Sequence, residues 1–264
     1  MKIENVKAVV FSPTGGTLKV TQALAQGVGL PYEIIDMTTP RTRIKAQTVF
    51  GSDLAIVASP VYYGHLTALA ADIFKKLIGH NTPTVITCVY GNRHYDEALL
   101  EMQNLLESQG FIVIAASAHV AEHSYSDERH DIAAGRPHAA DIEQAKEFGR
   151  QIRTAIDKSD FVAKRGLAVP FNPNPGYGFP EHPEPYIPKT LPGASDQWPH
   201  CIRICPAAAM AIRNDELHTD KSKCILCMAC VKSFPNARFF DHPLIAMAKD
   251  NLAKLPPREN ELWL

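Results

Sequence analysis

The sequence lacks an apolar run that approaches the ~20 residues needed to cross a bilayer. Its first residues, MKIENVKAVVF, contain neither a secretory hydrophobic region nor a small-residue cleavage site. The sequence also lacks an excess of one charge, because it has 27 Lys and Arg and 28 Asp and Glu, which gives a net charge of −1. Without a basic excess there is no electrostatic basis for non-specific nucleic-acid binding. These absences predict a cytoplasmic protein with neither a membrane nor a nucleic acid as partner.

Cysteine is nearly absent from the first 200 residues, which contain only Cys88. The other five cysteines fall within thirty residues: Cys201, Cys205, Cys224, Cys227 and Cys230. Disulfide frameworks belong to small secreted chains, so in a cytoplasmic chain this clustering indicates metal ligation. Cys88 falls inside a predicted buried strand, where we expect a small core residue.

Residues 1–157 alternate short apolar runs with helical patterns. Buried strands are expected at 6–11, 32–37, 54–58, 84–89 and 112–117, and helices after SPTGGT and at 68–78, 96–109 and 140–156. Repeated strand–helix units predict an α/β fold with a five-stranded, doubly wound parallel sheet and helices on both faces.

The composition changes after residue 157. Nine of the 20 prolines lie between Pro170 and Pro199, and proline excludes both helix interiors and central strands. We therefore predict four parts: a first domain at 1–157, a proline-rich connector at 158–196, a cysteine-bearing domain at 197–240 and a C-terminal extension at 241–264.

A small-residue loop, SPTGGT, separates the first predicted strand from its helix. A helix N-terminus at the carboxyl edge of a parallel sheet attracts anions. Gly15 and Gly16 allow close backbone approach, and Ser12, Thr14 and Thr17 supply hydroxyl groups. The loop lacks the lysine of a Walker motif and the GxGxxG pattern of dinucleotide sites. It predicts a phosphate site, with a capped turn rich in small residues as the alternative.

Two further loops follow the third and fourth predicted strands and leave the same edge of the sheet. They read SPVYYGHL and VYGNRHYDEAL, and their candidate ligand residues are Pro60, Tyr62, Tyr63, Tyr90, Gly91, Asn92, Arg93 and Tyr95. An anion loop beside aromatic side chains suits a flat, phosphorylated ring system.

These three loops resemble those of the flavodoxin family, which binds FMN through a Ser/Thr-x-Thr-Gly-x-Thr loop and two aromatic loops. The resemblance covers about residues 4–157. It implies that FMN is the cofactor and that Ser12, Thr14, Gly15, Gly16 and Thr17 hold its phosphate. It also implies that Tyr62, Tyr63, Asn92 and Tyr95 contact the flavin ring. Gly16 stands where many flavodoxins have Asn.

The cysteines form two incomplete copies of the bacterial ferredoxin run, C-x2-C-x2-C-x3-C-P. Cys224, Cys227 and Cys230 supply the first three positions of the second copy, whose fourth position is Phe234. The first copy keeps Cys201 and the terminal Cys205-Pro206, with Ser195 and Trp198 at its first two positions.

In two-cluster ferredoxins the fourth cysteine of each run ligates the cluster of the other run. One complete ligand set then remains: Cys205, Cys224, Cys227 and Cys230. The other set retains Cys201 alone, so we predict one [4Fe–4S] cluster and a free Cys201 thiol. Four thiolates also suit zinc, which remains the alternative, although zinc ligands are usually paired in two separate knuckles.

The whole chain resembles fusions of a flavodoxin-like domain with a bacterial-type ferredoxin domain. The shared segments are FSPTGGT, YGNR and Glu122-His123-Ser124. The resemblance implies an oxidoreductase that passes electrons between a redox partner protein, the cluster and the flavin, with a small molecule as a further candidate acceptor. The alternatives are a non-enzymatic electron carrier and a flavin-free iron–sulfur protein.

Overall fold

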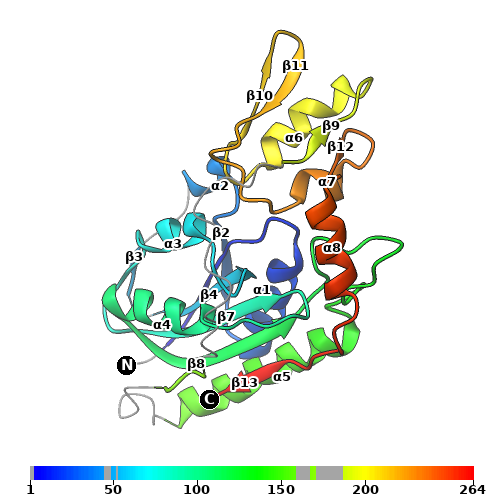
Figure 1. The fold of residues 1–264 in the computed structure, drawn as a ribbon. Helices are drawn as coiled ribbons and strands as arrows, with labels where there is room; N and C mark the ends of the chain where they lie inside the picture. Colours follow the sequence, from blue (N-terminus) through cyan, green and yellow to red (C-terminus); the bar gives the residue numbers. More distant parts are fainter. Residues whose placement is uncertain (1–2, 45–48, 52, 159–166, 171–186) are drawn as a thin grey trace.

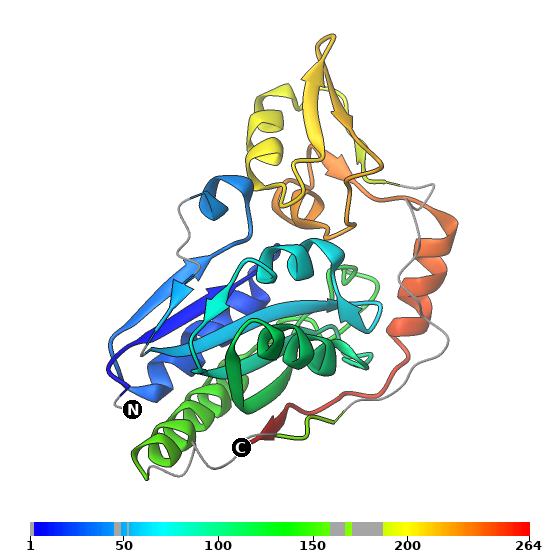
Figure 2. The same ribbon diagram turned by 90° about the vertical axis from the view of Figure 1, so that its left-hand side faces the viewer.

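A computed structural model describes residues 3–44, 49–51, 53–158, 167–170 and 187–264. Most of the predicted proline-rich connector lies outside these residues. The chain forms a large α/β domain, a smaller lobe beyond one end of its sheet, and a C-terminal segment that runs back from the lobe to the sheet (Figures 1 and 2). Within the described residues, no helix has both the length and the apolar character required to span a membrane.

The central sheet contains five parallel strands in the order β2-β1-β4-β7-β8, which is the flavodoxin-like strand order. Their bounds are β1 (Val6–Val10), β2 (Tyr32–Asp36), β4 (Leu54–Tyr62), β7 (Thr82–Tyr90) and β8 (Phe111–Val120). The prediction of a doubly wound parallel sheet is confirmed. A sixth strand, β13 (Glu261–Trp263), pairs antiparallel with β8 and was not predicted.

Helices cover both faces of this sheet (Figure 2). Helices α1 (Gly16–Val28) and α5 (Ala139–Asp157) pack on one face, and α3 (Ala68–Phe74) and α4 (Ala98–Ser108) pack on the other. Successive strand side chains alternate between the two faces, so the central strands are buried throughout. This burial explains why their sequences read as continuous apolar runs.

The face formed by α1 and α5 depends on two glycines. A Cβ on Gly27 would lie 2.0 Å from the carbonyl oxygen of Lys146, and one on Gly149 would lie 2.4 Å from that of Leu24. No side chain fits at such distances, so these glycines allow the helices to approach backbone to backbone.

Short elements complete the large domain at its edges. Helix α2 (Pro40–Arg43) follows β2, and β5 (His65–Leu66) forms a hairpin with the end of β4. Strands β3 (Val49–Phe50) and β6 (Ile78–Gly79) pair with each other. The β4–β5 hairpin matters for the site because it carries Tyr62 and Tyr63.

The small lobe has the element order strand, helix, hairpin, helix, strand. It comprises β9 (Lys189–Thr190), η2 (Ser195–Gln197), α6 (Trp198–Ile204), β10 (Met210–Arg213), β11 (Glu216–Thr219), α7 (Ala229–Ser233) and β12 (Arg238–Phe239). β9 pairs antiparallel with β12, and β10 pairs with β11. Each half of the lobe therefore contains one short helix that bears a cysteine, Cys201 in α6 and Cys230 in α7.

Aromatic side chains occupy two of the positions where the ferredoxin run would have cysteines. Trp198 and Phe234 pack in the same apolar cluster as Cys201, whose side chain is fully buried. The ring of Phe234 also stacks on His200, with ring centroids 6.0 Å apart. This core supplies packing where a second ligand set would have stood.

The C-terminal strap, residues 241–264, fastens the lobe to the sheet. It begins with α8 (Pro243–Leu252) and ends in β13. Asn260 anchors it: the side-chain oxygen accepts from the Val120 amide at 2.8 Å, and its amide group donates to Asp141 and Gln144 at 3.0 and 2.6 Å. A segment of mostly exposed residues is thereby held by polar bonds to the large domain.

The buried His119 in β8 makes stability sensitive to acid. Neither ring nitrogen has a hydrogen-bond partner among the described residues, and burial lowers the pKa to about 4, with Asp141 opposing and Arg136 adding to the shift. The unfolded chain, with a histidine pKa near 6.5, then binds more protons than the folded chain below that pH. Stability is therefore complete above about pH 6.5 and is lost as the pH falls toward 4, by up to about 3 kcal/mol from this residue.

We expect His119→Leu to flatten this acid dependence. Urea unfolding at pH 7 and pH 4.5 measures it, and the variant should lose about 2 kcal/mol less than wild type between these values. At pH 7 the variant should be at least as stable, because it removes an unpaired buried N–H. Equal losses in the two proteins would contradict the expectation.

Candidate functional site

The loop between β1 and α1 is shaped to leave amide groups open. Gly15 has φ +89°, a left-handed conformation that favours glycine, and it begins α1 without a side-chain cap. Ser12 accepts a bond from the Leu18 amide at 3.0 Å, and its own amide donates to Thr38 at 2.8 Å. No acceptor among the described residues meets the amides of Gly16 and Thr17. These two amides are the anion-binding groups of the loop.

These groups open into a cavity of about 190 Å³, which we call the loop pocket. It lies at the carboxyl ends of the strands and is lined by Thr14, Gly16, Thr17, Lys19, Pro60, Val61, Tyr62, Val89, Tyr90, Gly91, Ala121, Glu122, His123, Ser124, Arg136, Pro137 and Lys232. Lys232 comes from α7 in the small lobe and pairs with Glu122 at 2.6 Å. Lys19, Arg136 and Lys232 bring positive charge to a pocket that begins at a helix N-terminus.

A second cavity of about 350 Å³, the strap pocket, adjoins the first. Tyr62, Tyr90, Gly91 and His123 line both. The strap pocket also contacts Tyr63, Gly64, Arg93, His94, Ser124, Tyr125, Ile225, Leu226, Met247, Ala248, Asn251 and Leu252. Its walls are mostly apolar and aromatic, and α8 forms one of them. Together the two cavities have a polar end at α1 and an aromatic end under the strap.

Histidine 123 lies between the two cavities in a neutral form. Burial lowers its pKa to about 4, and the positive charges of Lys232 and Arg93 add to this effect. Its ring leaves no room for a side chain at Gly91, where a Cβ would lie 2.3 Å from His123 Cδ2. At neutral pH this imidazole is therefore a polar, uncharged part of the wall.

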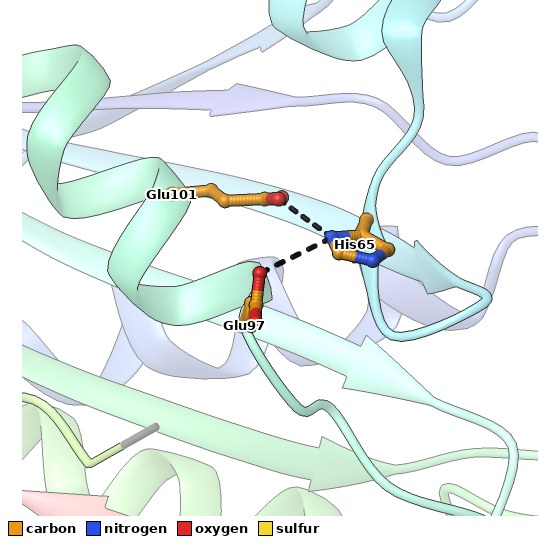
Figure 3. Close-up of side chains that lie close together, drawn as sticks. All are labelled: His65, Glu97 and Glu101. Carbon is orange, nitrogen blue, oxygen red and sulfur yellow. Dashed lines mark hydrogen bonds and ion pairs between the residues drawn. The ribbon is translucent and has the colours of Figure 1, made fainter. Parts of the chain in front are cut away.

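A hydrogen-bonded cluster fixes the β4–β5 hairpin to α4 (Figure 3). His65 Nδ1 lies 2.6 Å from Glu101 Oε1 and 3.9 Å from Glu97 Oε2. The second oxygen of Glu101 accepts from the Leu66 amide at 2.9 Å. Because one ring nitrogen faces both carboxylates at hydrogen-bond and ion-pair distances, the group holds the hairpin that carries Tyr62 and Tyr63.

Two predicted flavin contacts lie outside both pockets. Asn92, whose φ is +63°, donates to the carbonyl of Pro256 at 3.1 Å and accepts from the Arg258 amide at 2.9 Å. Tyr95 is buried and its hydroxyl donates to Glu261 at 3.1 Å. Both side chains fasten the C-terminal strap. Ser12 and Gly15 also do not line the loop pocket, and they shape the loop through a hydrogen bond and a left-handed backbone conformation.

The four cysteines chosen from the sequence line one small apolar cavity, the cysteine cavity. Cys205, Cys224, Cys227 and Cys230 surround it, with Pro188, Pro206, Ala207, Ala209, Met210, Thr219, Ile225, Leu226, Met228, Ala229 and Arg238. Cys201 is buried in the lobe core and Cys88 in the large domain, and neither lines this cavity. Burial raises the pKa of Cys224 to about 11 and that of Cys227 further. Neutral thiols in this cavity resist ionisation unless a cation binds them.

The spacing of the sulfur atoms tests which metal group suits them. No three described cysteine sulfurs lie mutually within 4.8 Å. A tetrahedral zinc site holds its sulfurs about 3.8 Å apart, as the Zn–S bond of about 2.3 Å requires. Among the described residues, the cysteine sulfurs are therefore not drawn together as a closed tetrahedral zinc set.

The cysteine cavity and the strap pocket share a wall. Ile225 and Leu226, between Cys224 and Cys227, line both. From the large domain, Arg43 donates to the carbonyl of Pro206 at 2.6 Å. The pKa of Tyr62 is raised well above its usual value by burial first and then by nearby Cys227 and Tyr125. The lobe therefore stands directly over the aromatic end of the strap pocket.

Several residues that line the two pockets could not be recognised as site residues from a sequence motif. Lys232 and the α8 residues Met247, Ala248, Asn251 and Leu252 reach the pockets from parts of the chain that looked like a separate domain and an extension. Glu122-His123-Ser124 appeared only as a shared segment, although His123 lines both pockets. Their position after the last parallel strand could have marked them, since ligands bind at that edge.

Comparisons with known proteins found similarity only among solved structures. No family model and no curated protein matches the chain. A flavodoxin from the domain Archaea has 12% identity and a TM-score of 0.40, over 59% of this chain and 99% of its own. The flavodoxin, WrbA-like protein of Agrobacterium tumefaciens has 16% identity and a TM-score of 0.39, over 59% and 98%. The rubredoxin oxygen:oxidoreductase of Desulfovibrio gigas has 18% identity and a TM-score of 0.40, over 59% and 36%.

Proposed function

We propose that this protein is a cytoplasmic oxidoreductase that contains one FMN and one [4Fe–4S] cluster and transfers electrons between them. The observation that supports this proposal most directly is that the cysteine cavity and the strap pocket share a wall, which is formed by Ile225 and Leu226. A loop that holds two cluster ligands would then also touch the flavin ring. That arrangement suits direct electron exchange within one chain.

The lobe supports the iron–sulfur half of the proposal. Its element order is β-α-β-β-α-β, the order of ferredoxin-like domains. Cys205, Cys224, Cys227 and Cys230 would be the ligands, with sulfurs spaced more widely than zinc requires. Cys201 stays a buried thiol, as the crossed ligand rule implies.

The two pockets support the flavin half. The amides of Gly16 and Thr17 and the hydroxyls of Thr14 and Thr17 would bind the FMN phosphate at the loop pocket. Tyr62 and Tyr90 line both cavities and would pack against the ring. Pro60, Gly91, Arg93 and Tyr63 line one or both pockets and complete the expected contact set.

A flavin exchanges one or two electrons and the cluster exchanges one, so the pair converts between single-electron and two-electron chemistry. The chain's residues orient and shield these groups. Helix α8 forms one wall of the strap pocket, and neutral His123 offers a polar group without adding charge. The His65–Glu101 bond holds the hairpin that presents Tyr62.

An external redox protein would exchange electrons at the lobe. Cys224 and Cys230 are only partly buried, and exposed Lys221 and Lys223 lie beside Cys224. This edge therefore brings two partly exposed cysteines close to two exposed lysines, of which Lys223 pairs with Asp220. A small acceptor would instead react under the strap, and turnover of such a molecule would distinguish an enzyme from a carrier.

The test is a visible spectrum of anaerobically purified protein, with flavin, iron and sulfide measured per chain. The proposal predicts one FMN, about four irons and about four sulfides. Iron without flavin would leave the flavin-free alternative. Zinc without sulfide would exclude the redox function.

A further inference from the structure

Arg238 is a buried cation that has no carboxylate partner among the residues the structure describes. Only 1% of the residue is exposed, and it is the largest of the fully buried side chains described. Its guanidinium donates to Thr190 Oγ1 at 2.6 Å, to the Pro188 carbonyl at 2.8 Å and to Thr219 Oγ1 at 2.8 Å. All three acceptors are neutral. In the described part of the chain no Asp or Glu forms an ion pair with it.

A charge buried in this way is costly unless an opposite charge lies beside it. Arg238 lines the cysteine cavity, together with Cys205, Cys224 and Cys230. Its Nε–H is buried and has no hydrogen-bond partner among the described residues. The guanidinium also lies beside the Cys230 thiol, whose pKa burial raises and Arg238 opposes. The uncompensated positive charge of Arg238 and its unpaired Nε–H donor therefore both lie at the cysteine cavity.

We propose that Arg238 is the counter-charge of the cysteine site, where its guanidinium offsets the thiolate charge and its Nε–H donates a hydrogen bond to a sulfur. The inference rests on the proposed cluster and deepens it. Reduction adds one electron, and so one negative charge, to a group already surrounded by four thiolates. A buried cation stabilises the reduced form more than the oxidised form, so Arg238 raises the reduction potential.

The test compares Arg238→Gln and Arg238→Lys with wild type by anaerobic redox titration, monitored by EPR of the reduced cluster. At a fixed ambient potential, Arg238→Gln should lower the ratio of reduced to oxidised cluster at least tenfold, which is 59 mV for one electron. Arg238→Lys keeps the charge and should shift the ratio less. Arg203→Gln is the matched control, because Arg203 is exposed on α6 and a screened surface charge should change the ratio less than threefold.

Iron and sulfide contents, measured on the same samples, separate the two claims. If wild type holds about four irons and sulfides but Arg238→Gln leaves the ratio unchanged, the role of Arg238 is wrong and the proposed function stands. If wild type holds no sulfide, the proposed function itself fails. Should Arg238→Gln assemble no cluster, Arg238→Met takes its place, because it also removes the charge: a shift within the threefold range of the control contradicts the proposal, and a larger downward shift supports it.

Discussion

Cys227→Ala is expected to remove at least nine tenths of the bound iron and sulfide while FMN stays bound. Cys227 is buried where it lines the cysteine cavity, and burial raises the pKa of its thiol far above the usual value. Iron supplies the charge that offsets this cost, and three thiolates no longer complete the ligand set. Iron, sulfide and flavin assays on anaerobically purified protein measure the effect.

Cys201→Ala is the matched control, since Cys201 is also buried in the same lobe but lies outside the cavity. It should keep its full iron content and lose only about 1 to 2 kcal/mol of stability from the small cavity it leaves. Cys201 is also the residue that an incomplete first ligand set would use. Equal iron loss in both variants would contradict the crossed ligand assignment.

Gly16→Asp is expected to weaken FMN binding roughly 100-fold, which corresponds to about 3 kcal/mol. Gly16 begins α1 and lines the loop pocket, so a carboxylate there would meet the phosphate and compete for the open amides. The same carboxylate is favourable at a helix N-terminus, so the fold should not be weakened electrostatically. Fluorescence titration of flavin-free protein with FMN measures the affinity.

Gly16→Asn separates charge from size. Either side chain would bring a Cβ within 3.3 Å of Ala121 Cβ, so the two variants share their steric cost. The FMN affinity of Gly16→Asn should be within about tenfold of that of wild type. For riboflavin, which lacks the phosphate, Gly16→Asp and Gly16→Asn should have equal affinities. Equal FMN affinity in the two variants would place the phosphate elsewhere.

The sheet could be predicted because its strands are buried on both faces. The run at 54–58 is continuously apolar and the run at 6–10 is interrupted only by Lys7, and the loops that follow them leave the carboxyl edge by the geometry of parallel sheets. The cysteine ligand set stays a prediction, which rests on the crossed ligand rule that links Cys205 to the distant run at 224–230.

The strap could not be predicted, because no local pattern specifies it. Strand β13 has three residues and gains its structure only by pairing with β8. Its anchors, Asn92 and Tyr95, sit in a loop that resembles a flavin loop, so their positions suggested flavin contacts. Ser12 is similar: a hydroxyl in a phosphate-loop pattern instead accepts the Leu18 amide and shapes the turn. Partners far along the chain therefore decide the roles of Asn92 and Tyr95, whereas the Ser12 hydroxyl bonds within its own loop.

An anaerobic titration with dithionite tests the central claim most directly, because it counts the electrons that one chain accepts. One flavin takes two electrons and one cluster takes one, so the account predicts about three electrons per chain. The flavin and cluster absorption bands should both bleach during the titration. Two electrons would mean that no cluster is present, one would mean that no flavin is present, and four would mean a second cluster; each result would contradict the account.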